Sequence, residues 1–362
     1  MRRLCGSVDS PGLLAAGPDE LREIDLQLWG RLCLARPEPA GLLPIPGQLS
    51  PTEGRMLFHL LAEVWNGSGH VVELGTLFGA STQAIGLGMA ANPARNGRLC
   101  SADAFGTYFP PEEMVAQLEP LLGGRSDWPA VSADFRERGF ERAFAALHAS
   151  DRPYSGFITV TRCLFPLGPG DSPAALREFL EAASPIGVAF VDSVKHWHGV
   201  RAVVLELMPR LATGALVAWQ DQRWFNAFAI CFFNERLAPW LEPLAIGDGM
   251  HVYRYRGGAT RAELESLLPA AAADAGAPEL RRVFEEVAWR SYLANDAYGV
   301  LSATLQLAFA LADVGRISEA LELFRVARSM PGFLRHDDLF RIAEAELAEL
   351  TGAPDRQRVS SE

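Results

Sequence analysis

One short segment joins an apolar run to an acidic residue and two glycines, a pattern that suits the binding of a small ligand. Residues 70–82 read HVVELGTLFGAST, with Glu73 near the end of the apolar run and Gly75 and Gly79 in the turn after it. Glycine lets the backbone turn tightly and approach a ligand at the carboxyl end of a strand. The spacing differs from that of the dinucleotide fingerprint. The alternative interpretation is a tight strand-to-helix turn that binds nothing.

A second carboxylate follows the next apolar run. Residues 98–102 form that run, and Asp103 comes directly after it. A carboxylate at the end of a second parallel strand can accept hydrogen bonds from both hydroxyls of a ribose. With the glycine turn, Asp103 would define one crevice of nucleoside size.

Two later apolar runs also end close to an aspartate. Asp192 follows residues 188–191, and Asp221 comes two residues after the run 215–219. The ends of neighbouring parallel strands lie side by side, so both carboxylates could reach one divalent cation. Such a cation lowers the pKa of a bound hydroxyl, and Lys195 could then take the proton as a general base. The alternative is a structural ion pair or a helix-capping set.

Two histidines lie beside this lysine. His196 and His198 flank Trp197, and the direction of their side chains in a loop does not follow from sequence. A polar rim or a substrate contact is therefore favoured over a metal pair. His198 is kept as an alternative general base.

The first motif resembles motif I of the class I S-adenosylmethionine-dependent methyltransferases, which has the form E-x-G-x-x-x-G-x-S. The resemblance covers about residues 51–256. It implies that S-adenosylmethionine (SAM) is the cofactor. It also implies the residues that bind SAM, namely Glu73, Gly75, Gly79, Ser81 and Asp103.

The second motif resembles that of catechol O-methyltransferase and related enzymes, where a strand ends in Asp-x-x-Lys and a later strand ends in Asp-Asn. The wider pattern is also similar to the macrocin O-methyltransferase-like branch of bacterial proteins. The resemblance implies that Asp192, Asp221 and Gln222 bind Mg²⁺ and that Lys195 is the base. Gln222 stands where the family has asparagine, which leaves a metal-independent reaction open.

The elements that must position these residues alternate between short apolar runs and helical segments, which indicates an α/β fold. We expect strands near 70–74, 98–102, 157–161, 187–191 and 215–219, and a closing hairpin at 243–247 and 250–256. Helices are expected near 19–34, 51–65, 80–91, 174–183, 199–211 and 225–237. With the resemblance, this predicts a Rossmann-like methyltransferase fold, a mostly parallel seven-stranded sheet with an antiparallel closing hairpin.

The composition divides the chain into unequal parts. We expect an N-terminal arm at 1–50, a methyltransferase-like domain at 51–256 with an insertion at 104–156, a C-terminal helical appendage at 257–352, and a disordered tail at 353–362. The appendage contains one hairpin similar to a tetratricopeptide unit, near 305–330. Such a unit cannot bury its own apolar face, so it should pack on the α/β domain or on a second copy of the chain.

Charge and composition narrow the class of protein. The 362 residues carry 33 basic and 44 acidic side chains, a net charge of −11, which disfavours nucleic acid as a partner. A membrane-spanning run and a signal peptide are absent, so we expect a cytoplasmic protein. The five widely spaced cysteines suggest neither a zinc site nor a disulfide framework.

The function expected from the sequence is O-methylation of a small hydroxylated acceptor, a sugar or a phenolic natural product, in a homo-oligomer. Mg²⁺ assists in one version of this hypothesis. The alternatives are a metal-independent N- or O-methyltransferase and a non-catalytic methyltransferase-like protein that acts in assembly.

Overall fold

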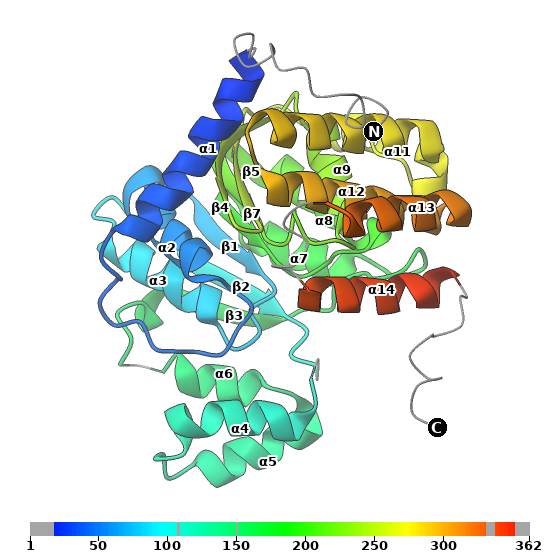
Figure 1. Cartoon of the computed structure of the whole chain (residues 1–362). Helices are drawn as coiled ribbons and strands as arrows, with labels where there is room; N and C mark the ends of the chain where they lie inside the picture. Colours follow the sequence, from blue (N-terminus) through cyan, green and yellow to red (C-terminus); the bar gives the residue numbers. More distant parts are fainter. Residues whose placement is uncertain (1–17, 107–108, 150, 331–336, 352–362) are drawn as a thin grey trace, which may run out of the picture.

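The computed structural model describes residues 18–106, 109–149, 151–330 and 337–351 (Figure 1). The predicted disordered tail and the first part of the predicted arm lie outside the described residues. Within the described ranges, no helix is long and apolar enough to cross a membrane.

A seven-stranded sheet forms the centre of the protein, with the strand order β3-β2-β1-β4-β5-β7-β6. Strands β1 to β5 are parallel, and β7 runs antiparallel to both β5 and β6. The strands are β1 (His70–Leu74), β2 (Leu99–Asp103), β3 (Ile158–Arg162), β4 (Ile186–Val191), β5 (Leu211–Trp219), β6 (Leu241–Gly247) and β7 (Met250–Tyr255). This topology confirms the predicted Rossmann-like methyltransferase fold with an antiparallel closing hairpin.

Helices cover both faces of the sheet, which explains why the central strand β4 is apolar along its whole length. One face carries α1 (Pro18–Ala35), α2 (Pro51–His59), the π-helical turn η2 (Leu60–Val64) and α3 (Ala80–Ala91). The other face carries α7 (Ala174–Ala182), α8 (Trp197–Leu207), the 3-10 turn η4 (Met208–Arg210) and α9 (Phe228–Arg236). All six residues of β4 are buried between these layers.

The insertion at 104–156 forms accessory helices that project away from the sheet (Figure 1). They are α4 (Pro111–Leu122), α5 (Trp128–Arg138) and α6 (Glu141–Leu147), followed by the 3-10 turn η3 (Ser155–Phe157). They share a hydrophobic cluster of their own, in which Phe105 and Phe140 pack edge to face with ring centroids 5.3 Å apart. Phe78 of the glycine turn belongs to the same cluster, so the insertion rests directly on the proposed cofactor loop.

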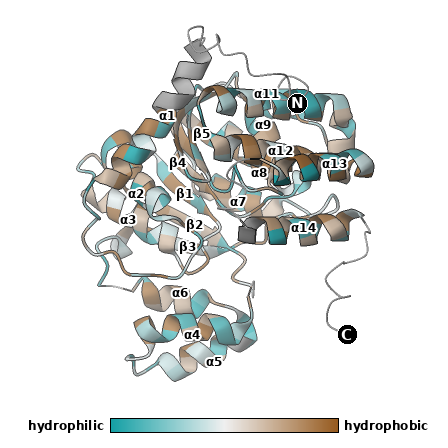
Figure 2. Ribbon diagram, in the orientation of Figure 1, coloured by the Kyte–Doolittle hydropathy of each residue, from teal (hydrophilic) through white to brown (hydrophobic). Residues whose placement is uncertain are grey.

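The helical appendage packs on the α8 and α9 face of the α/β domain, one of the two arrangements expected. It consists of α10 (Arg261–Leu267), α11 (Ala272–Leu293), α12 (Ala297–Asp313), α13 (Ile317–Arg328) and α14 (Asp337–Thr351). One continuous hydrophobic cluster runs from the sheet into these helices. Figure 2 shows hydrophobic residues along the strands and α12, and hydrophilic residues over much of α11. Helix α12 is therefore the inner helix of the appendage.

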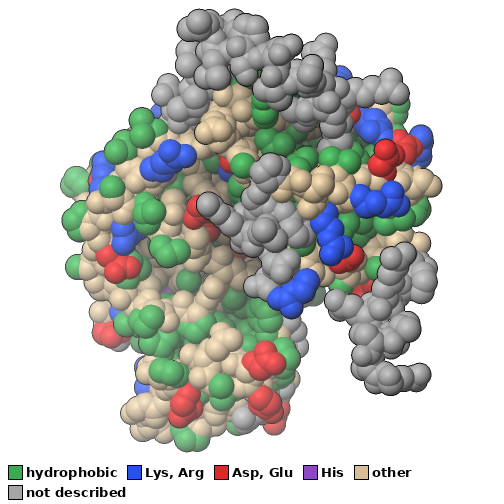
Figure 3. Space-filling view, in the orientation of Figure 1, with side chains coloured by type: hydrophobic (Ala, Val, Ile, Leu, Met, Phe, Trp, Pro, Cys, Tyr) green, Lys and Arg blue, Asp and Glu red, His purple; other side chains and the backbone are tan. Residues whose placement is uncertain are grey.

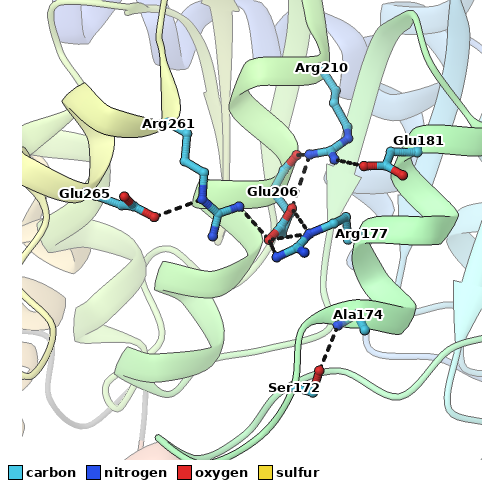
Figure 4. A network of polar contacts seen from close by, with 8 residues as sticks. All are labelled: Ser172, Ala174, Arg177, Glu181, Glu206, Arg210, Arg261 and Glu265. Atoms are coloured by element: carbon cyan, nitrogen blue, oxygen red, sulfur yellow. Dashed lines mark hydrogen bonds and ion pairs between the residues drawn. The ribbon is translucent and has the colours of Figure 1, made fainter.

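A buried carboxylate ties the appendage to the domain (Figure 4). Glu206 of α8 is fully buried and accepts hydrogen bonds from three arginines on different elements. Arg177 of α7 lies 2.9 Å away, Arg261 of α10 2.8 Å and Arg210 of η4 3.2 Å. Burial alone would raise the pKa of Glu206, but the hydrogen bonds and charges of Arg177 and Arg261 hold it below its usual value.

Candidate active site

Each of the two motif glycines lies where the backbone passes very close to another part of the protein, so neither position has room for a side chain. Gly75 and Gly79 both have a φ of 88°, in the left-handed region that favours glycine. A Cβ on Gly75 would lie 2.6 Å from the carbonyl oxygen of Asp192, so this turn passes directly over the end of β4. A Cβ on Gly79 would overlap Nε2 of His148, which is hydrogen-bonded to the carbonyl of Phe78. Gly79 thus lets the glycine turn pack closely against the insertion.

Glu73 lies beneath the turn and braces it. Its carboxylate accepts hydrogen bonds from Ser81 (2.6 Å), Thr82 (2.7 Å) and Ser101 (2.7 Å). Burial raises the pKa of Glu73 to about 7 against the opposing effect of these hydroxyls. The structure therefore joins β1, β2 and α3 through Glu73, which is turned toward these hydroxyls and does not line the cavity described below.

Asp103 holds the same turn from the second strand. One carboxylate oxygen, Oδ2, accepts from the amides of Thr76 (2.7 Å) and Leu77 (3.0 Å), and the other, Oδ1, accepts from Phe105 (2.8 Å). Since a carboxylate oxygen offers two acceptor positions, Oδ1 retains one for a further donor. Asp103 is in this way both part of the loop and able to receive a ligand hydroxyl.

A cavity of about 370 Å³ opens at the carboxyl ends of β1, β2 and β4. This volume lies in the range of small-molecule and cofactor sites. Two segments that the sequence analysis singled out form much of its wall, namely the glycine turn and the end of β4. From the turn come Gly75, Thr76, Leu77 and Ser81 with Asp103, and from the end of β4 come Asp192, Ser193, Val194, Lys195 and His196. Residues 46–49, Phe109 and Leu167 close the remaining sides.

Lys195 is the only lysine in the chain, since 32 of the 33 basic residues are arginine. Its ammonium forms an ion pair with Asp221. Burial opposes the charge of Lys195, but the charges of Asp221 and Asp192 outweigh burial and raise its pKa. The predicted role as a general base assumed a pKa lowered by a bound metal ion, whereas the ion pair with Asp221 favours the ammonium form, which can donate hydrogen bonds.

The predicted metal set does not assemble. The side chain of Gln222 turns away from Asp192, donates to the hydroxyl of Tyr253 (2.7 Å) and accepts from Asn234 (2.8 Å). It lines a separate cavity of about 300 Å³ that lies against the closing hairpin and the appendage. Asp221 is engaged by Lys195, and the described residues contain no group of three His, Cys, Asp or Glu that could hold a metal ion. Gln222 therefore does not complete the predicted donor set, and we assign no step to Mg²⁺.

The two histidines differ in their position relative to the cavity. His196 lines the cavity at an exposed position, whereas His198 does not line it. The charges of both histidines act on Asp313 at the end of α12, so both lie near the appendage. The structure thus supports the polar-rim interpretation for His196 and places the alternative base away from the cavity.

Sequence reasoning missed Glu53, which lies close to the Lys195 pair. Glu53 is buried and accepts hydrogen bonds from Gln220 (3.2 Å) and the amide of Gly249 (3.0 Å). The capping box that Glu53 forms with Ser50 at the start of α2 is a local sequence pattern, but that pattern gives no sign of this second role.

Sequence reasoning also missed a contribution of the appendage. Glu346 of α14 hydrogen-bonds Asn226 at 2.8 Å, and its charge adds to the effects that raise the pKa of Lys195.

On the described part of the face in Figure 3, basic and acidic side chains are interspersed over the appendage, without a broad basic area.

Comparison with known proteins bears on the same segment. Residues 72–222 match a family described as a methyltransferase domain. A search of the curated proteins gives no match. The family match spans β1 to the residues after β5, and with the strand order it confirms the predicted resemblance. The segment 72–222 is therefore similar to a methyltransferase domain.

Several solved structures resemble the chain at low identity. An O-methyltransferase from Bacillus cereus in complex with SAH is 17% identical, with a TM-score of 0.36, covering 67% of this chain and 93% of that chain. The O-methyltransferase TomG of tomaymycin synthesis from Streptomyces achromogenes, in complex with SAM, is 16% identical, with a TM-score of 0.34, covering 68% and 93%. A methyltransferase of the mycinamycin pathway, in complex with Mg, SAH and mycinamycin VI, is 12% identical, with a TM-score of 0.33, covering 65% and 56%.

Proposed function

We propose that the protein transfers a methyl group from SAM to a hydroxyl group of a small molecule without help from a metal ion. The observation that carries this proposal is the cavity at the carboxyl ends of β1, β2 and β4. One side of it is the glycine turn held by Asp103, and the other is the end of β4 with Asp192 and Lys195. The cofactor's nucleoside and the acceptor hydroxyl would thus bind in the same cavity.

The turn side suits the nucleoside part of the cofactor. Oδ1 of Asp103 is placed to accept a hydrogen bond from a ribose hydroxyl, and the backbone at Gly75 and Thr76 lines the cavity without a bulky side chain at Gly75. The bound cofactor supplies the reactive methyl group on its sulfonium. Glu73 contributes indirectly, by holding Ser81 and the start of α3 against the turn.

The strand-end side suits the acceptor. The Lys195 ammonium can donate a hydrogen bond to the acceptor oxygen and fix its position for in-line attack on the methyl carbon. As the new C–O bond forms and the S–C bond breaks, the hydroxyl proton must leave. Asp192 lines the cavity next to Lys195 and is the carboxylate placed to accept that proton. Burial, followed by the charge of Asp221, raises the pKa of Asp192, and the charge of Lys195 opposes this effect.

Calorimetric titration with SAM and with its demethylated product S-adenosylhomocysteine tests the cofactor half of this proposal. We expect micromolar binding of both ligands that is the same with Mg²⁺ and with a chelator. Asp103→Asn should weaken binding, while the exposed variant Asp274→Asn on the appendage should not. Absence of binding heat together with an unchanged melting temperature would refute the proposal.

A further inference from the structure

Three consecutive backbone carbonyls directly after Asp221 are bound by side chains of the appendage helix α12. Nε2 of Gln306 donates to the carbonyls of Gln222 (2.7 Å) and Trp224 (2.8 Å). Oγ of Ser302 donates to the carbonyl of Arg223 (2.5 Å). One helix from outside the matched methyltransferase segment therefore holds the segment 222–224.

These polar groups lie in an otherwise apolar setting. Gln306 and Ser302 are 1% and 4% exposed, and most of the helix around them is alanine, leucine and phenylalanine. A buried amide or hydroxyl is unfavourable unless it is hydrogen-bonded, so apolar residues would serve packing alone equally well. An ion pair adds to the attachment, because Asp296 at the N-cap of α12 lies 2.6 Å from the guanidinium of Arg223.

The residue before this segment has an unfavourable backbone conformation. Asp221 has a φ of 57°, in the left-handed region that residues other than glycine seldom adopt. Such a conformation persists only where surrounding contacts fix it. The amide of Trp224 donates to the carbonyl of Asp221 at 2.8 Å, which closes a turn over the segment that α12 holds. Asp221 in turn is the ion-pair partner of Lys195.

We infer that α12 is a positioning element of the active site, in which Gln306 and Ser302 fix the segment 222–224 and thereby hold Asp221 against Lys195. The inference rests on the proposed function for its role in catalysis, but the positioning itself is a structural property. The helical appendage is then part of the site that activates the acceptor, while the glycine turn binds the cofactor without it.

The single lysine makes this positioning observable. Protein labelled with ¹³C-lysine should give one lysine Cε cross-peak in a heteronuclear NMR spectrum, and Asp221→Asn should shift it by removing the ion pair. Gln306→Leu, which fills the same space without hydrogen bonds, should move the cross-peak toward the Asp221→Asn position. Thr304→Val is the matched control, because Thr304 lies on the same helix, is equally buried, and bonds only to its own helix at Val300. Thr304→Val should leave the cross-peak in place.

A purely structural role for Gln306 would lower the melting temperature and leave the lysine cross-peak unchanged, and that result would overturn the inference. Ser302→Ala is the milder second variant, and it should give a smaller shift in the same direction if Gln306→Leu does not fold. An unchanged cross-peak in every variant that folds would equally overturn the inference. SAM binding by calorimetry separates the two proposals, since it should survive Gln306→Leu. Failure of the wild-type protein to bind SAM would count against the proposed function alone.

Discussion

Lys195, the only lysine of the chain, is ion-paired with Asp221, a residue held in a left-handed backbone conformation. Arginine occupies every other basic position, including those of the buried network around Glu206. Lysine differs from arginine in carrying a compact charge that donates hydrogen bonds from a single atom. The Lys195–Asp221 pair therefore indicates a position where the compact lysine ammonium is needed and an arginine guanidinium could not replace it.

The first prediction concerns this compact charge. Lys195→Ala should leave SAM affinity unchanged and reduce turnover about 100-fold, the order expected for loss of a group that positions or activates the acceptor. Lys195→Arg retains the positive charge but not its shape, so it should also keep SAM affinity and should recover turnover only in part. The measurement is the formation of S-adenosylhomocysteine with an acceptor found by screening hydroxylated compounds. Full turnover by Lys195→Ala would remove Lys195 from the reaction.

The second prediction concerns the fit between the glycine turn and the insertion. Gly79→Ala should destabilise the fold by about 3 kcal/mol, because a Cβ there meets His148 and the backbone has a positive φ. SAM binding should weaken together with stability, since the turn would shift. Gly106→Ala is the control, because a Cβ at Gly106 meets nothing within 4 Å. Denaturant unfolding and calorimetry measure both effects, and equal stability of the two variants would contradict the fit.

The third prediction is a pH dependence that arises from Glu73. Burial raises its pKa from the usual 4.5 to about 7, so the folded state binds this proton more tightly than the unfolded state. The stability from this proton is fully present below pH 4.5 and is lost as the pH rises to about 7, a loss of about 3 kcal/mol. Glu73→Gln cannot titrate, so its unfolding free energy should lack this decrease between pH 5 and pH 8. The exposed variant Glu113→Gln should keep the wild-type slope, and an identical slope for Glu73→Gln would show that Glu73 is ionised throughout.

The fourth prediction concerns the attachment of the appendage. Glu206→Gln leaves three arginines without their shared carboxylate and should lower the free energy of unfolding by about 3 kcal/mol. Glu265→Gln removes only a surface partner of Arg261, so it should cost no more than about 1 kcal/mol. Equal effects of the two variants in denaturant unfolding would show that the buried network adds nothing beyond a surface pair.

The fold follows from the sequence where local signals and long-range packing agree. The strand His70–Leu74 and the helix Ala80–Ala91 have the predicted bounds, because an apolar run and a pair of glycines leave the chain few alternatives between them. Helix α12 begins at Ala297, earlier than the predicted start at 305, because the side chain of Asp296 caps it by accepting from the amide of Gly299 at 3.0 Å.

The site follows from the sequence less fully, because side-chain direction depends on distant partners. Asp192 and Lys195 line the cavity as expected, since the end of a parallel strand fixes their place. Gln222 does not join them, because Tyr253 and Asn234 hold its amide on the other side of the turn. Glu73 matches the motif, but Ser101 and Thr82 direct its carboxylate beneath the loop. Neither the contacts of Gln222 nor those of Glu73 can be read from a local sequence pattern.

One measurement tests most directly whether the cofactor binds beside the only lysine. Protein labelled with ¹³C-lysine is titrated with SAM, and the Lys195 cross-peak is followed to saturation. The cavity predicts a shift that saturates at the calorimetric affinity and that requires a higher concentration of SAM in Asp103→Asn. Binding of SAM by calorimetry with an unmoved Lys195 cross-peak would show that the cofactor lies elsewhere, and would contradict the assignment of this cavity as the site of methyl transfer.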